Sequence, residues 1–180
     1  MDLTGKLVRL RALRDSDARF IAEYLAIPDV AQNLASWAQL PYTKEQAHEF
    51  IARHDPRSVA WAIETTGMET AFIGMTGLAD LDFRNRHCEW GIWIGPPSNW
   101  GKGYGTEACT LATRYAFHQL GMEKVYLKVY ETNPGARRAY EKAGYKVEGT
   151  LPRDHWCEGG FTTSYLMAAY RDDPMYGGSR

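Results

Sequence analysis

Three alternate glycines, Gly101, Gly103 and Gly105, stand between two apolar segments and constrain the fold more than any other feature of the sequence. The preceding segment, Cys88 to Ile94, has the short apolar run of a buried strand. In the following segment, apolar residues recur at helical spacing as far as Gly121. Glycines at such a junction allow the backbone to turn its N–H groups toward one point and to approach an anion closely. The sequence therefore predicts a strand, an anion-binding loop and a long helix in succession.

The anion that such a loop would hold is expected to be a pyrophosphate. The first N–H groups of a helix have no partner within the helix and lie at the positive end of its dipole. Two common nucleotide motifs are excluded, because the run has no GxxxxGK followed by Ser or Thr and because Thr106 stands where the dinucleotide fingerprint needs a third glycine. A plain strand-to-helix turn without a ligand is the alternative.

Length and composition predict one globular domain. The chain has 180 residues, 44% of them hydrophobic and 24% charged, and its net charge is -1. We expect a single domain over residues 1–171 and a flexible tail over residues 172–180. The near-zero charge gives no general attraction to nucleic acid, and no run reaches the roughly 18 apolar residues of a membrane span. We therefore expect neither nucleic-acid nor membrane binding, and a cytoplasmic location.

Cysteine and histidine spacing indicates neither disulfides nor a metal site. The cysteines Cys88, Cys109 and Cys157 are odd in number and widely separated, so we interpret them as free thiols at buried or half-buried positions. The five histidines show no ligand spacing such as HExxH. No metal is expected.

The remaining pattern predicts an α+β or mixed α/β fold in which helices pack on a sheet. Residues 6–11 alternate apolar with basic side chains, as a half-buried strand does. Thr43 and Gln46 form a capping box at the start of a helix. The other expected strands are residues 59–63, 71–82, 88–94 and 125–130, with two more around residues 158–160.

A second informative stretch follows the strand at residues 125–130. Asn133 is a good N-cap, Pro134 a good first helical residue and Gly144 a good C-terminal stop, which together predict a short helix. Tyr140 shares one face of this helix with three alanines, so its phenol is expected to turn inward, where a buried hydroxyl needs a partner.

Together these stretches resemble the GNAT superfamily of acetyltransferases. The glycine run is similar to that family's coenzyme A pyrophosphate motif, (Gln/Arg)xxGx(Gly/Ala), except that Trp100 stands where the motif has Gln or Arg. Residues 133–145 are similar to its Asn…Tyr…Gly-(Phe/Tyr) motif. The likeness spans residues 9–168 and, through Trp100 and segments 40–50 and 90–94, favours the branch of ribosomal-protein N-terminal alanine or serine acetyltransferases. It implies a GNAT-like, largely antiparallel twisted central sheet of about seven strands with helices on both faces.

The resemblance implies an acetyl-CoA-dependent N-acetyltransferase. In such an enzyme a primary amine attacks the thioester directly in a ternary complex, without a covalent acetyl-enzyme. The branch implies that the acceptor is the N-terminal α-amine of a protein or peptide. Two alternatives stay open: a small-molecule amine, such as a polyamine, an amino acid or an aminoglycoside, and a coenzyme A-binding sensor without turnover. A homodimer, the commonest oligomer, is the default assembly.

Two catalytic residues are implied. Tyr140 is similar to the family tyrosine beside the coenzyme sulfur, where its hydroxyl protonates the leaving thiolate; a plain core tyrosine is the alternative. Glu89 interrupts an apolar strand, and a carboxylate there is costly to bury without a partner or a task. We interpret Glu89 as the general base and as a contact for the acceptor amine, with an exposed edge position or a structural salt bridge as the alternative.

The resemblance also implies the cofactor contacts. Main-chain groups of Ile92, Trp93 and Ile94 are expected to hold the pantetheine arm, and Asn133 to touch it. Arg137 and Arg138 could both meet the phosphates, with solvated surface residues as the alternative, and of the two we retain Arg137 as an expected contact. Trp37 is expected to shape the acceptor cleft. The expected pyrophosphate contacts are Gly101, Lys102, Gly103, Tyr104, Gly105 and Thr106.

Overall fold

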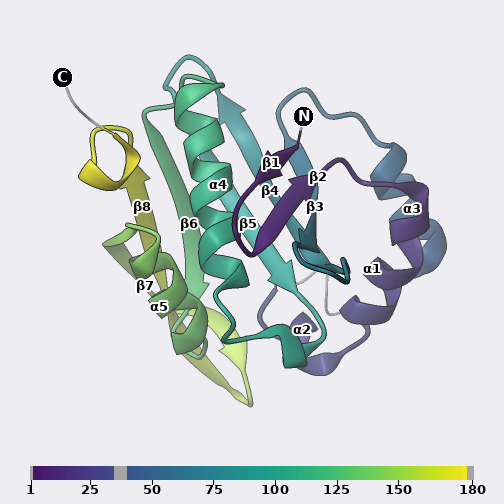
Figure 1. Ribbon diagram of the computed structural model, residues 1–180. Helices are drawn as coiled ribbons and strands as arrows, with labels where there is room; N and C mark the ends of the chain where they lie inside the picture. Colours follow the sequence, from purple (N-terminus) through teal and green to yellow (C-terminus); the bar gives the residue numbers. More distant parts are fainter. Residues whose placement is uncertain (1, 35–39, 178–180) are drawn as a thin grey trace.

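The computed structural model describes residues 2–34 and 40–177 and contains one eight-stranded sheet (Figure 1). The strand order is β1-β2-β3-β4-β5-β6-β8-β7, and every neighbouring pair is antiparallel except β5 and β6. The predicted mixed, largely antiparallel sheet is thus confirmed, with one additional short strand. The strands are β1 (Leu3–Thr4), β2 (Val8–Arg11), β3 (Val59–Thr65), β4 (Phe72–Asp82), β5 (His87–Ile94), β6 (Lys124–Tyr130), β7 (Lys146–Cys157) and β8 (Gly160–Tyr170).

Helices cover both faces of the sheet. Three helices, α1 (Ala18–Leu25), α2 (Pro28–Ala31) and α3 (Lys44–Ala52), gather beside the β2–β4 half, whereas α4 (Tyr104–His118) runs along the opposite face with α5 (Pro134–Lys142) beside it (Figure 1). The capping box predicted for α3 is present, because the Gln46 N–H donates to Thr43 Oγ1 at 3.2 Å and the Thr43 N–H to Gln46 Oε1 at 2.8 Å. None of the helices within the described ranges is long and apolar enough to cross a membrane.

Each face of the sheet has its own apolar core, and the alternation within β3 shows how the sequence builds both. Trp61 and Ile63 lie in the core under α4, whereas Ala62, between them, lies in the core under α1 to α3. Successive side chains of a strand point to opposite faces, so a strand covered on both sides is apolar at nearly every position. This explains why the central strands read as continuous apolar runs.

The two halves of the sheet are joined at one end only. Within the described chain, β5 pairs with β6 at three positions, of which the last is Glu89 opposite Tyr126. Beyond that point β5 continues beside β4 as far as Ile94, and β6 continues beside β8 as far as Tyr130. The strands therefore diverge toward their carboxyl ends, and the main-chain groups that face the opening have no strand to pair with.

The end of the described chain packs against α4 and against the end of α5. We expected residues 172–180 to form a flexible tail, but Pro174–Tyr176 forms a 3₁₀ turn and Tyr176 is buried against Phe117. The Tyr176 hydroxyl also donates a hydrogen bond to the Ala143 carbonyl. Packed structure therefore continues beyond the expected boundary at residue 171, as far as Tyr176, and the domain limits stay a prediction; residues 178–180 lie outside the described part.

Candidate active site

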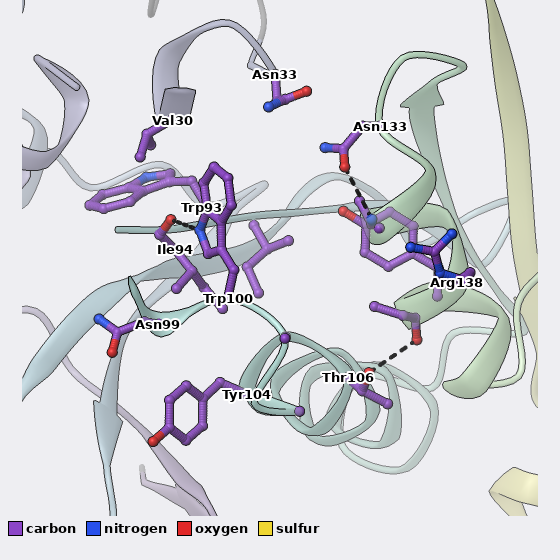
Figure 2. A pocket seen from close by; sticks show the side chains of 18 of the residues that line it. Val30, Asn33, Trp93, Ile94, Asn99, Trp100, Tyr104, Thr106, Asn133 and Arg138 are labelled. Carbon is purple, nitrogen blue, oxygen red and sulfur yellow. Dashed lines mark hydrogen bonds between the residues drawn. The ribbon is translucent and has the colours of Figure 1, made fainter. Parts of the chain in front are cut away.

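A cavity of about 370 Å³ lies where β5 ends, where α4 begins and beside α5 (Figure 2). Val30 of α2 and the residues Asn33 and Leu34 that follow this helix form its remaining wall. Stretches that are far apart in the sequence thus meet at the opening between β5 and β6. Ten of the predicted site residues line the cavity: Ile92, Trp93, Ile94, Gly101, Gly103, Tyr104, Gly105, Thr106, Asn133 and Tyr140.

The glycine loop has the backbone conformation that an anion cradle requires. Gly101 and Gly103 have φ angles of 74° and 88°, in the left-handed region that favours glycine. Gly103 is the N-cap of α4, and the first hydrogen bond of the helix runs from the Glu107 N–H to the Gly103 carbonyl at 3.0 Å. The N–H groups of residues 104–106 precede that bond and belong to residues that line the cavity. This end of α4 can therefore bind a diphosphate.

Trp100, the departure from the family motif, attaches the loop to the end of β5. Its indole Nε1–H donates to the Ile94 carbonyl at 2.7 Å, and its ring lines the cavity (Figure 2). A Gln or Arg at this position would supply a polar side chain, whereas Trp100 supplies a fixed connection between the loop and the strand.

The start of α5 is held by Asn133. Its Oδ1 accepts the Ala136 N–H at 3.1 Å, so the predicted N-cap is confirmed. With Oδ1 engaged in this bond, Nδ2 is the donor of the side chain; no described residue accepts a hydrogen bond from it, and Figure 2 shows it pointing away from the helix. A separate hydrogen bond joins α4 to α5: Thr106 Oγ1 donates to the Ala139 carbonyl at 3.4 Å.

Of the two neighbouring arginines of α5, Arg138 lines the cavity and the predicted Arg137 does not. Arg137 pairs with Glu141, at 3.0 Å from Nε to Oε1, and its guanidinium lies 4.4 Å from the ring centroid of Tyr165. Arg138 lines the cavity together with Lys142 (Figure 2). The reason is helical spacing, since residues 135, 138, 139 and 142 share one face and residue 137 points away from it.

Tyr140 lines the cavity and packs edge-on against Trp90, with ring centroids 5.3 Å apart. Burial raises the pKa of its phenol well above the usual range. Tyr140 therefore stays protonated at neutral pH and can donate a hydrogen bond to an anion that forms beside it.

Glu89 lies at the apex of the opening, in the last paired position of β5 and β6. Its neighbours Cys88 and Trp90 are buried in the core under α4, so the Glu89 side chain is on the opposite face of the sheet from Tyr140. Glu89 is half-buried and does not line the cavity. Burial and the nearby charge of Asp80 raise the pKa of the Glu89 carboxyl, while Lys128 opposes this shift.

One further predicted contact in the described part of the chain is not brought to the cavity. Lys102 is exposed and absent from its lining. Trp37 lies outside the described residues, so its role stays a prediction.

Comparison with known proteins decides the family. Residues 8–146 match the model of the acetyltransferase (GNAT) domain. The chain belongs to the GNAT family. It is therefore an acyltransferase that uses acetyl-CoA, and the predictions of fold, enzyme class and cosubstrate are confirmed.

This acetyltransferase has relatives with named acceptors. Spermidine N(1)-acetyltransferase of Escherichia coli K12 is 28% identical over 167 residues, which cover 91% of this chain and 86% of that protein. The crystal structure of spermidine N-acetyltransferase from Vibrio cholerae in complex with CoA and spermine superposes with a TM-score of 0.79 and 27% identity, covering 91% of this chain and 95% of that one. A GNAT acetyltransferase from Bacillus anthracis has a TM-score of 0.80 at 19% identity, covering 96% of this chain and all of that one, and supports the fold alone.

Sequence reasoning missed several residues of this GNAT site. Arg138 and Lys142 could have been found by counting helical turns from Gly135 and Ala139, which share their face of α5. Val30, Asn33 and Leu34 carried no usable signal, because they reach the cavity only through the packing of α2.

Proposed function

We propose that this acetyltransferase acts on a primary amine of a small molecule, with polyamines as the first class to test. The observation that supports acetyl transfer is the single cavity that joins the glycine loop, the free edge of β5 and Tyr140. The support for the acceptor comes from the spermidine acetyltransferases, which match over most of both chains. The N-terminal α-amine predicted from the ribosomal-protein branch has no comparable support among these relatives.

The cosubstrate is proposed to lie along the opening of the sheet. Its diphosphate meets the N–H groups of residues 104–106, with Arg138 and Lys142 adding positive charge nearby. Its pantetheine arm runs beside residues 92–94, whose main-chain groups face the gap left by β6. Asn133 Nδ2 supplies one further donor. In this position the thioester reaches the apex between Glu89 and Tyr140.

The proposed reaction uses Glu89 and Tyr140, which lie on opposite faces of the sheet at this point. An amine with the pKa of a lysine, about 10.4, is protonated at neutral pH and must lose a proton before it can attack. Glu89 accepts that proton, and its raised pKa makes it a stronger base than an ordinary carboxylate. The amine nitrogen forms a bond to the acetyl carbon, the carbon–sulfur bond breaks, and Tyr140 donates its proton to the departing thiolate. The second proton that the nitrogen loses on becoming an amide passes through solvent to the Tyr140 phenolate, and Glu89 releases its proton to solvent.

No thiol is proposed to carry the acetyl group. Burial raises the pKa of Cys109 to about 12, and this residue of α4 is buried in the core between the helix and the sheet. A thiol that stays protonated is a weak nucleophile. Direct attack in a ternary complex therefore remains the proposed course, with rate gained from holding the two substrates together.

An acceptor panel tests the proposal. Release of coenzyme A thiol would be measured with spermidine, spermine, single amino acids, an aminoglycoside and peptides with a free α-amine. We expect the polyamines to give the highest kcat/KM. Preference for peptides would favour the protein-acceptor function, and tight coenzyme A binding without turnover on any amine would favour the sensor.

A homodimer and a cytoplasmic location are also proposed, on composition and base rate alone. Sedimentation velocity tests the first, since a monomer at micromolar concentration would contradict it. Cell fractionation tests the second.

A further inference from the structure

The turn between β1 and β2 is attached to the first turn of α4 by one side chain. The Glu107 carboxylate accepts three consecutive main-chain N–H groups, from Lys6 at 2.9 Å, Leu7 at 2.7 Å and Val8 at 2.8 Å. A carboxylate has about four acceptor positions, so three donors occupy most of its capacity. Such charge-assisted hydrogen bonds are the stronger kind.

The same turn contacts the glycine loop directly. A Cβ atom at Gly103 would lie 3.3 Å from Leu7 Cδ1, so the Leu7 side chain packs against the loop. A Cβ atom at Gly5 would lie 2.4 Å from Glu107 Oε2, so only glycine allows the carboxylate to approach this turn so closely. The loop is therefore supported at two points by residues about a hundred positions earlier in the chain.

The position of Glu107 also matters for charge. It follows directly after residues 104–106, whose N–H groups are proposed to bind the diphosphate. A carboxylate in the first turn of a helix ordinarily interacts with the N–H groups of its own helix, where it would compete with an anionic ligand. The bonds to residues 6–8 direct the Glu107 carboxylate to the β1–β2 turn, and the end of α4 stays available for the ligand.

We propose that Glu107 is a positioning residue for the diphosphate of acetyl-CoA. Bound to the β1–β2 turn, it fixes the glycine loop in the conformation that turns the N–H groups of residues 104–106 toward the cavity. This role rests on the proposed function, which places the diphosphate at those groups, and Glu107 itself does not touch the cosubstrate.

The substitution Glu107→Gln separates positioning from simple electrostatics. It removes a negative charge near an anionic ligand, which by itself would tighten binding of acetyl-CoA. It also replaces one acceptor oxygen by a donor that faces main-chain N–H groups, which loosens the loop. We expect the loosening of the loop to outweigh the change in charge, so that the affinity for acetyl-CoA falls by about tenfold or more.

Two acetyl donors provide the test. S-acetylpantetheine has the same thioester as acetyl-CoA but no diphosphate. With acetyl-CoA we expect Glu107→Gln to lower kcat/KM by about tenfold, mainly through KM, whereas with S-acetylpantetheine kcat/KM should stay near the wild-type value. Leu7→Ala should act in the same direction more weakly and is a second variant should the first fail to fold. Glu123→Gln, at a surface pair with Arg86, is the matched control and should change neither.

The outcomes are distinguishable. Equal losses with both donors, unchanged kinetics, or tighter acetyl-CoA binding in Glu107→Gln would overturn the positioning role. A wild-type enzyme that used both donors equally well would overturn the proposed diphosphate site and the positioning role together.

Discussion

Replacing Tyr140 by phenylalanine tests the proposed acid with little disturbance of the fold. The hydroxyl belongs to a residue that lines the cavity, and none of the described residues is hydrogen-bonded to it. Its removal therefore leaves no partner unsatisfied, and the free energy of unfolding should hardly change. Turnover should fall by roughly 10- to 1000-fold, because the thiolate loses one hydrogen-bond donor in a partly desolvated site.

Tyr145 is the matched control, because it is a second buried tyrosine five residues away. It is 2% exposed, and its hydroxyl lies 2.7 Å from Thr113 Oγ1. Tyr145→Phe leaves the Thr113 hydroxyl buried without this partner, which should cost about 1–3 kcal/mol of stability. Turnover should stay near wild type, since Tyr145 is not part of the cavity lining.

The two variants therefore predict opposite patterns. Initial rates with saturating acetyl-CoA and thermal unfolding would be measured for both proteins, with the KM for acetyl-CoA expected to stay constant. Because burial raises the pKa of Tyr140, the acid stays protonated throughout the usual assay range, and the loss should be equal from pH 7 to pH 9. Full turnover in Tyr140→Phe, or a loss that Tyr145→Phe reproduces, would refute the assignment.

Three further predictions follow from the site. Arg138→Ala should raise the KM for acetyl-CoA several-fold, and more at low salt than at high salt, whereas Arg137→Ala should leave it unchanged. Steady-state kinetics of both variants at two ionic strengths would check this, and equal KM values for the two variants would contradict it. Glu89→Gln should lower kcat/KM by about 10²- to 10⁴-fold. In the wild type, kcat/KM falls at acid pH as Glu89 becomes protonated below its raised pKa, and the variant should lack this part of the fall. An unchanged pH profile would exclude Glu89 as the base. Gly74→Ala should lower both the melting temperature and the affinity for acetyl-CoA, because its Cβ would lie 2.1 Å from a carbonyl oxygen of β5. Gly91→Ala, whose Cβ would meet open space, is the control and should change neither value in calorimetry and binding measurements.

Local patterns predicted most of the fold. Alternation and apolar runs located β2 to β6, and cap residues located α3 and α5, because these signals act over a few neighbouring residues. The two-residue β1 was missed because it is too short to show a period. The parallel pairing of β5 with β6 and the placement of β8 between β6 and β7 depend on contacts between distant segments, which a single sequence does not display.

The candidate site was predicted where a motif is continuous in the sequence and less well where it is not. Five residues of the glycine loop line the cavity as expected, together with Asn133 and Tyr140, whereas Lys102 and Arg137 do not. Arg138 and not Arg137 lines the cavity, because the side of α5 that each residue occupies decides which of the two cations reaches it. Two features depend on contacts between distant parts of the chain: the cavity wall formed after α2 and the hydrogen bonds of Glu107 to the β1–β2 turn. No local sequence pattern predicts them.

The early end of the β5–β6 pairing has a consequence for how such enzymes diversify. A ligand that takes the place of a missing neighbour in the sheet is recognised through amide and carbonyl groups, which every residue type possesses. Side chains along that edge can then change through evolution or engineering while use of the donor persists. New acceptors can be accommodated by altering the other wall, with no need to rebuild the part that binds the coenzyme.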